Sequence, residues 1–219
     1  RQQNPTLRRQ RQMCIRDSAT AMRMKDERLL PGYNAQITTS EQFIINATIH
    51  RTSSDSTALI PHVSQLEQRL EGSVGPDWRP DYTADAGYGS EENYELLDNK
   101  GYTAYVKYPS WYQEHTGQLS KKLFNSYNWF FDPEQDYYLC PNQKKLRFKE
   151  QILKKSRNGY KRQLKVYQCQ DCAGCPLFDQ CRGTNAKPGS NRRILRSDKL
   201  EAYKEQVRKR LASEEGKAK

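Results

Sequence analysis

An aspartate before a glycine-rich turn is the first residue whose surroundings suggest chemistry. Asp85 stands in the string Ala-Asp-Ala-Gly-Tyr-Gly, at the end of residues 81–86, which predict a short strand. A carboxylate at the carboxyl end of a strand in an α/β sheet projects toward the edge where ligands and metal ions bind. In the structural alternative, Asp85 opens a tight turn and Gly87 and Gly89 adopt positive φ.

Five cysteines flank a basic segment in the second half of the chain. Four of the six cysteines follow the pattern Cys169-x2-Cys172-x2-Cys175-x5-Cys181, and Cys140 precedes the basic segment. Structural zinc takes four ligands in a tetrahedron, often from two chain segments. We therefore predict a Zn²⁺ site of Cys140, Cys172, Cys175 and Cys181, with Cys169 as the alternate. An iron–sulfur cluster and free structural thiols are the open alternatives.

The basic segment itself predicts a β-ribbon. Residues 144–165 hold ten Lys or Arg and one acid, Glu150, and Asn158-Gly159 is a typical hairpin turn. Such a ribbon could follow DNA phosphates in a groove, and the alternative is a solvated face. With so much charge it should have little core, so zinc is expected to hold its base together. The predicted DNA contacts are Lys144, Lys145, Arg147, Lys154, Lys155, Arg157, Lys161 and Arg162.

Composition agrees with a polyanionic partner. The chain has 37 Lys and Arg against 26 Asp and Glu, a net charge of +11. No apolar run approaches the roughly 18 residues that span a bilayer, and no signal-like stretch opens the chain, so we expect a cytosolic protein without a membrane partner. In a reducing compartment, clustered cysteines favour metal over disulfides. The three histidines show no catalytic spacing.

The elements around Asp85 alternate between strands and helices. Leu59, Val63, Leu66 and Leu70 recur at helical spacing, and Ser90 followed by two glutamates is typical of a helix start. The expected order is strand 33–39, strand 43–51, helix 55–70, strand 81–86, a helix from Ser90 to Gly101, and strand 102–108. This order favours an α/β fold with a sheet of mixed direction.

The remaining segments complete the expected domain organisation. Residues 1–18 include a string, 12–18, that resembles translated sequencing-adapter DNA, so we expect this segment, with Cys14, to be extraneous or disordered; a genuine basic tail is the alternative. Ser197 should cap a helix ending at Gly216, whose apolar stripe returns to the first sheet. The expected divisions are 1–18, a core at 19–110, an insertion at 111–196 and the helix at 197–219.

A series of short motifs carries a family resemblance across residues 19–219. The motifs are Arg23-Met24-Lys25, Gly32-Tyr33-Asn34-Ala35-Gln36, Asp55-Ser56-Thr57-Ala58-Leu59, Ala84-Asp85-Ala86-Gly87-Tyr88-Gly89-Ser90, Tyr138-x-Cys140-Pro141, Cys172-Ala173-Gly174-Cys175-Pro176-Leu177, Cys181 and Ser213-Glu214-Glu215-Gly216. In this order they resemble bacterial insertion-sequence transposases of the Asp-Asp-Glu type. The resemblance implies an RNase-H-like mixed sheet interrupted by a basic, cysteine-rich β-ribbon insertion.

The resemblance also implies a reaction and its partners. Two Mg²⁺ or Mn²⁺ ions held by Asp, Asp and Glu would activate water to cut DNA at the transposon end, and the freed 3′-hydroxyl would then attack target DNA. Asp85 matches the second aspartate of that triad. The partners would be transposon-end and target DNA, and a homo-oligomer of the full-length protein is compatible with this activity.

Two members of the triad have no match in this chain. The family's first aspartate lies on an Asp-Gly-Thr strand, which does not occur here, and Asp17 is no substitute. The family's glutamate follows a Glu-Gly-x-Phe-Gly type motif, and Glu214 and Glu215 precede that point. We therefore expect a piece truncated at both ends and inactive alone. The competing hypotheses are a zinc-stabilised nucleic-acid-binding protein without catalysis and a metal-dependent nuclease.

Overall fold

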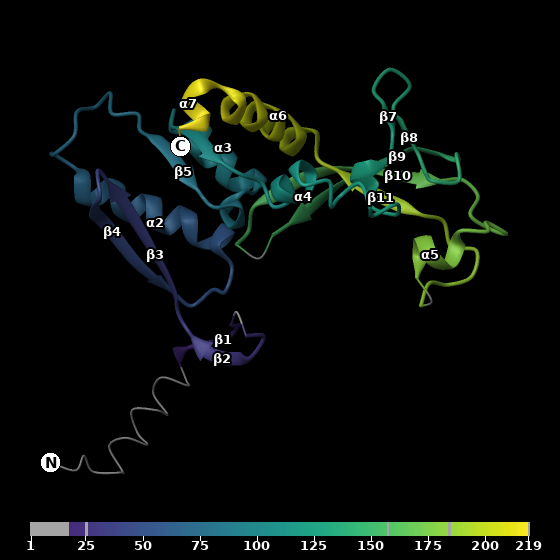
Figure 1. Cartoon of the computed structure of the whole chain (residues 1–219), viewed down its shortest axis with the longest axis horizontal. Coiled ribbons are helices and arrows are strands. Elements are labelled where there is room, and N and C mark those ends of the chain that lie inside the picture. Colours follow the sequence, from purple (N-terminus) through teal and green to yellow (C-terminus); the bar gives the residue numbers. More distant parts are fainter. Residues whose placement is uncertain (1–17, 25, 157, 184, 219) are drawn as a thin grey trace, which may run out of the picture. The chain divides into compact units, whose positions relative to one another are not determined.

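The chain forms two compact units, Arg1–Lys107 and Tyr108–Lys219, each described here by itself. The structure is a computed structural model that describes residues 18–24, 26–156, 158–183 and 185–218 (Figure 1). Cys14, Asp17, Arg157 and nearly all of the segment expected to be extraneous lie outside the described residues. Within the described residues the fold is mixed α/β, which confirms the predicted class at that level.

The strands of the first unit pair two by two. They are β1 (Thr20–Arg23), β2 (Leu29–Gly32), β3 (Asn34–Ser40), β4 (Phe43–His50), β5 (Asp81–Ala84) and β6 (Thr103–Val106). β1 and β2 are antiparallel, β3 and β4 form the predicted hairpin, and β5 runs parallel to β6. Glu41 and Gln42, with φ of 48° and 72°, make the two-residue turn between β3 and β4.

Two helices carry the core of the first unit. α2 (Asp55–Leu70) buries Leu59, Val63 and Leu66 as their spacing predicted, and it lies along the β3–β4 hairpin (Figure 1). α3 (Glu91–Asn99) begins at Ser90, whose side chain accepts a hydrogen bond from the Asn93 backbone N–H. Gly101, at φ of 70°, follows the end of α3. The predicted helices are therefore confirmed close to their expected bounds.

The single mixed sheet expected for this unit is not present among the described residues. β3 pairs only with β4 and β5 only with β6, so each has an unpaired edge within the described chain. A groove of about 470 Å³ is lined by Ile37–Thr39 of β3, Asp81–Asp85 and residues of α2. Strands must lie about 4.8 Å apart to share hydrogen bonds, which this gap prevents.

The second unit is organised around one continuous antiparallel sheet with the order β11-β10-β9-β8-β7. Its strands are β7 (Phe131–Asp132), β8 (Tyr137–Leu139), β9 (Lys145–Lys155), β10 (Lys161–Cys169) and β11 (Arg193–Arg196). β9 and β10 are the predicted basic ribbon, with Gly159 at φ of 94° in its tip. A bulge interrupts their register between Val166 and Tyr167.

The expectation that the ribbon has little core of its own is wrong. Leu146 of β9 and Tyr167 of β10 are completely buried, and they cluster with Tyr138 and Ile194 from the flanking strands. The rings of Tyr138 and Tyr167 meet edge to face at 5.0 Å between centroids. Because β8 and β11 add apolar and aromatic side chains on either side, the charged ribbon acquires a hydrophobic face.

The helices of the second unit are short except for one. They are α4 (Trp111–His115), α5 (Phe178–Arg182), α6 (Asp198–Ala212) and α7 (Glu214–Lys217). Ser197 caps α6 as predicted, accepting from the Leu200 N–H at 3.1 Å. α6 ends at Ala212 and not at Gly216, because Ser213 turns extended and caps α7. Within the described residues, none of the helices has the length and apolar character to cross a membrane.

Candidate functional site

Asp85 lies at the strand-to-turn position that the sequence predicted. It follows β5 directly, is exposed, and accepts a hydrogen bond from the Ala86 backbone N–H at the start of the 3₁₀ turn Ala86–Tyr88. The positive φ expected for Gly87 and Gly89 in the structural alternative is absent, and Gly89 has φ of −69°. The turn thus holds the Asp85 carboxylate at the surface without needing left-handed glycines.

Gly87 instead lies close to a second carboxylate. A Cβ atom on Gly87 would stand 2.9 Å from the Asp55 Oδ2 atom, so glycine permits a close approach between the turn and α2. Asp55 is the first residue of α2, and its Oδ1 accepts from Asn34 Nδ2 at 2.8 Å and from Gln36 Nε2 at 3.1 Å. A second carboxylate is therefore fixed beside the Asp85 turn by β3.

Both carboxylates affect the pKa of Tyr88. Burial first, and then the nearby charges that include Asp55 and Asp85, raise the pKa of Tyr88 to about 12. The sequence had indicated only Asp85 as a functional carboxylate. Asp55 was missed because an aspartate at a helix start is ordinarily a cap. One of the motifs that carry the family resemblance begins at Asp55, and this was the signal that could have pointed to it.

A buried histidine lines the same groove as Asp85. His62 is 3% exposed, and its two ring nitrogens hydrogen-bond with the Thr38 and Thr48 hydroxyls, each at 2.6 Å. Burial lowers the pKa of His62 below its usual range. The neutral ring is therefore held as a hydrogen-bonding link between α2, β3 and β4.

The structure brings all five described cysteines to one small cavity in the second unit. Cys140 follows β8, Cys169 ends β10, Cys172 and Cys175 lie in the next loop, and Cys181 lies in α5. Together they line a cavity of about 20 Å³, which is the size of one ion or water molecule. However, no three Cys, His, Asp or Glu side chains of the described residues converge on a common metal-binding point.

The sulfur atoms differ in their hydrogen bonds. Cys172 Sγ accepts from the Arg192 backbone N–H and Cys175 Sγ from Asn142 Nδ2, both at 3.4 Å. Cys169 instead donates its S–H to the Asp171 carbonyl at 3.6 Å, and burial raises the pKa of the Cys169 thiol to about 11. N–H donors stabilise thiolates, so Cys172 and Cys175 have surroundings that differ from those of Cys169, while burial also raises the pKa of the Cys181 thiol.

The predicted DNA-contacting side chains fall into different surroundings. Lys144 donates to the Asp171 carbonyl at 2.8 Å and lies 3.7 Å from its carboxylate. Lys145 lies over the Tyr137 ring, 4.0 Å from the centroid. Arg147 is exposed on β9, whereas Arg157 lies outside the described residues. Two of the predicted contacts are therefore already engaged within the protein.

The other four predicted contacts form two cross-strand pairs near the ribbon tip. Lys155 is paired with Lys161, and Lys154 with Arg162. Lys154 and Arg162 also line an open cavity of about 640 Å³, together with aromatic side chains such as Tyr127 and Trp129. The Nε atom of Arg162 is buried there without a hydrogen-bond partner among the described residues. Like charges opposite one another are unfavourable unless an anion lies between them.

Comparison with known proteins gives one family. Residues 139–219 match the family model described as "Transposase DDE domain". The match covers the five cysteines from Cys140 to Cys181, the ribbon and α6, and it does not reach Asp85. No curated protein and no solved structure matches the chain. The resemblance to insertion-sequence transposases is thus confirmed over residues 139–219, which are similar to the transposase DDE domain family.

Proposed function

We propose that this chain is part of an RNase-H-like DNA transposase of the Asp-Asp-Glu type, which cuts and joins DNA at the ends of an insertion sequence in the bacterial cytoplasm. The observation that carries the proposal is the transposase-domain match of residues 139–219. The element order β3, β4, α2, β5, α3, β6 in the first unit is consistent with an RNase-H-like core. Its partners would be transposon-end and target DNA, and the full-length protein would act as a homo-oligomer.

Asp85 would be one metal ligand of this enzyme. Its carboxylate is exposed at the end of β5, and oxygen ligands of this kind suit Mg²⁺ or Mn²⁺. No completed carboxylate cluster is present among the described residues, so the other ligands would come from elsewhere. Such ions would polarise the phosphodiester and activate water. The role of Asp85 would be to hold one of them beside the groove.

The groove between β3 and β5 supports the expected arrangement of the missing aspartate. Among the described residues each of these strands pairs with one neighbour only, and both line a space of about 470 Å³ that Asp85 also lines. A strand added there would pair with β3 on one side and with β5 on the other. It would thereby join the β3–β4 hairpin and the β5–β6 pair into one sheet. We propose that the Asp-Gly-Thr strand of the family occupies this groove and brings its aspartate beside Asp85.

The test begins with the reading frame that surrounds this chain. An upstream Asp-Gly-Thr strand, a downstream glutamate helix and terminal inverted repeats outside them are the expected result. The protein expressed from that frame should then transfer transposon-end DNA into a target plasmid with Mg²⁺ or Mn²⁺. A frame lacking both acids would contradict the proposal, and DNA cutting without joining would point to a nuclease.

We further propose that Zn²⁺ binds at the cysteine cluster, with Cys140, Cys172, Cys175 and Cys181 as ligands. The gathering of these thiols around an ion-sized cavity supports this, although binding would require the side chains to turn toward a common point. Four thiolates around Zn²⁺ would tie the loop and α5 to the end of the sheet. Metal analysis of the purified protein, with one Zn²⁺ per chain expected, tests this.

A second candidate function is a zinc-stabilised nucleic-acid-binding protein without catalysis. It is favoured by the fact that the family match and the basic ribbon lie in the second unit, apart from Asp85. This candidate predicts that Asp85→Ala leaves DNA binding unchanged and that no strand transfer occurs in any metal. Strand transfer that depends on Asp85 would exclude it.

A further inference from the structure

The cations of the second sheet divide into those that have a neutralising partner and those that do not. Lys165 and Arg196 both contact the Asp198 carboxylate, at 2.9 and 2.7 Å. In contrast, several cations of this sheet contact no carboxylate among the described residues, and three exposed ones, Arg147, Lys149 and Arg193, lie close together on β9 and β11. These three are therefore a concentration of uncompensated positive charge on the folded surface.

These three cations surround a single neutral side chain, Gln168. In the sheet register Arg147 of β9 lies opposite Gln168 of β10, and Gln168 lies opposite Arg193 of β11. The Gln168 Oε1 atom accepts from Lys149 Nζ at 2.9 Å and from Arg193 Nε at 2.7 Å. Directly opposed residues of neighbouring strands share a face, so the four side chains form one cluster.

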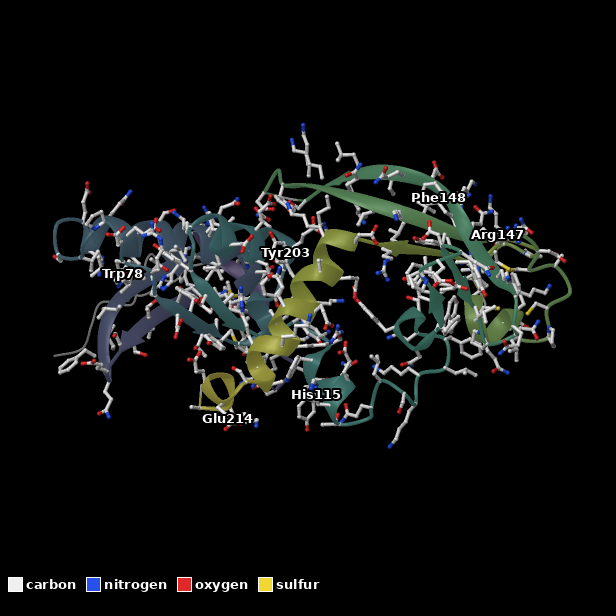
Figure 2. All side chains as sticks on the ribbon, turned by 90° about the horizontal axis from the view of Figure 1, so that it is seen from above. Trp78, His115, Arg147, Phe148, Tyr203 and Glu214 are labelled. Carbon is white, nitrogen blue, oxygen red and sulfur yellow. The ribbon has the colours of Figure 1, made fainter. Side chains whose placement is uncertain are left out.

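The cluster lies on the face of β9 opposite the aromatic core. Phe148 follows Arg147 directly, and Figure 2 labels both residues on this strand. The Phe148 ring lies 6.2 Å from the buried Tyr167 ring, which marks the core side. Because successive strand residues point to opposite faces, Arg147 points away from that core. The cluster is consequently open to a ligand in solution.

The hydrogen bonds leave donors available for an anion. Gln168 holds two cations together through one oxygen but neutralises neither, and mutual repulsion among three cations is unfavourable until an anion is bound. Arg193 uses only its Nε on Gln168, so the two terminal nitrogens of its guanidinium remain. Guanidinium and ammonium groups arranged around one point suit the oxygens of a phosphate.

We propose that Arg147, Lys149, Gln168 and Arg193, named here the Gln168 cluster, bind a phosphodiester group of DNA. This inference rests on the proposed DNA-related function and narrows it to one place on the sheet. It adds three residues to the predicted contacts and retains Arg147 from them. Lys144 and Lys145 are left out of the cluster because Lys144 donates to the Asp171 carbonyl and Lys145 lies over the Tyr137 ring.

The experiment measures how the affinity of the full chain for a fluorescent DNA duplex changes with salt. One variant, Arg147→Gln with Lys149→Gln and Arg193→Gln, removes the three cations of the cluster. The matched control, Lys165→Gln with Lys209→Gln and Lys217→Gln, removes three lysines that contact carboxylates. Both variants lose the same charge, so a general effect of net charge affects them equally.

The cluster variant is expected to lower the slope of log K against log salt by about 1, since each phosphate contact contributes about 0.9. Over a tenfold rise in salt the wild type should therefore lose about eightfold more affinity than the cluster variant, whereas the control variant should respond to salt nearly as the wild type does. Gln168→Glu provides an isosteric second variant, because its carboxylate would occupy the cations and should weaken DNA binding similarly. Circular dichroism verifies that each variant folds.

Three outcomes overturn the proposal in distinguishable ways. If the slope of log K against log salt is the same for the wild type, the cluster variant and Gln168→Glu, the cluster does not bind a DNA phosphate. DNA binding by another part of the protein would remain possible. A wild type that binds DNA without salt dependence, or not at all, would remove the DNA-related function as well. Saturable binding of inorganic phosphate that depends on Arg147, with no change in DNA affinity, would assign the cluster to free phosphate.

Discussion

The two units place different chemistry on differently built sheets. In the first unit the strands pair two by two, Asp85 lines the groove, and the Asp55 carboxylate lies close to Gly87 in the following turn. In the second unit five strands form one sheet with thiols at one end and cations over one face. The split sheet offers room for a further strand and carries the candidate catalytic residue. The continuous sheet has a complete core and carries the candidate binding residues.

The largest expected effect is on catalysis and concerns the first unit alone. Asp85→Asn should reduce strand transfer by the protein expressed from the enclosing reading frame at least about 1,000-fold, because a lost metal ligand removes several kcal/mol of transition-state stabilisation. DNA affinity should stay unchanged, since binding is assigned to the second unit. Asp98→Asn, an exposed aspartate on α3, is the control. Retained strand transfer in the Asp85 variant would contradict the assigned role.

The next effect concerns metal in the second unit. Cys172→Ser should release Zn²⁺ and unfold the region from Cys140 to Cys181, while the first unit remains folded, because thiolate ligands tie a loop and α5 to the sheet. Cys169→Ser is the matched control, since Cys169 donates to a carbonyl and is expected to retain the metal. Zinc stoichiometry is measured for both. Unchanged zinc in the Cys172 variant would rule out this ligand set.

Core substitutions compare the stability of the two units directly. Leu59→Ala in the first unit and Leu146→Ala in the second each remove a side chain that is at most 1% exposed. Each should cost about 2–5 kcal/mol of its own unit's unfolding free energy. Hydrogen exchange should show the loss of protection confined to the unit that carries the substitution. Equal loss in both units would mean that they unfold together.

Local patterns predicted much of this fold from the sequence. Apolar spacing gave α2, serine caps gave the starts of α3 and α6, and the Asn-Gly turn gave the ribbon tip. Long-range pairing was beyond such patterns. The bond from Arg193 to Gln168 spans 25 positions and depends on β11, a four-residue strand with no clear alternation. The groove likewise exists because β3 and β5 do not pair with each other, and no local sequence pattern predicts which strands pair.

A smaller effect, again in the first unit, depends on pH. Burial lowers the pKa of His62 in the folded state, so the unfolded chain binds more protons as pH falls. Stability should therefore be complete above about pH 6.5, the unfolded value, and decline as pH falls toward the depressed folded pKa. Denaturant unfolding of the first unit, followed by its hydrogen exchange, measures this. His62→Gln should remove the decline; a decline that persists would assign it to other groups.

The smallest effect compares one ion pair from each unit. Lys100 contacts Glu67 at 2.8 Å with both side chains about 30% exposed, and the Tyr102 hydroxyl donates to the same carboxylate at 2.6 Å. Lys217 contacts Glu214 at 2.6 Å, but these side chains are 61% and 90% exposed. Exposed pairs contribute about 0–1 kcal/mol because water screens them. Lys100→Ala should therefore cost a measurable part of 1 kcal/mol, whereas Lys217→Ala should cost nothing measurable. Equal costs in thermal unfolding would show that the shared carboxylate adds no stability.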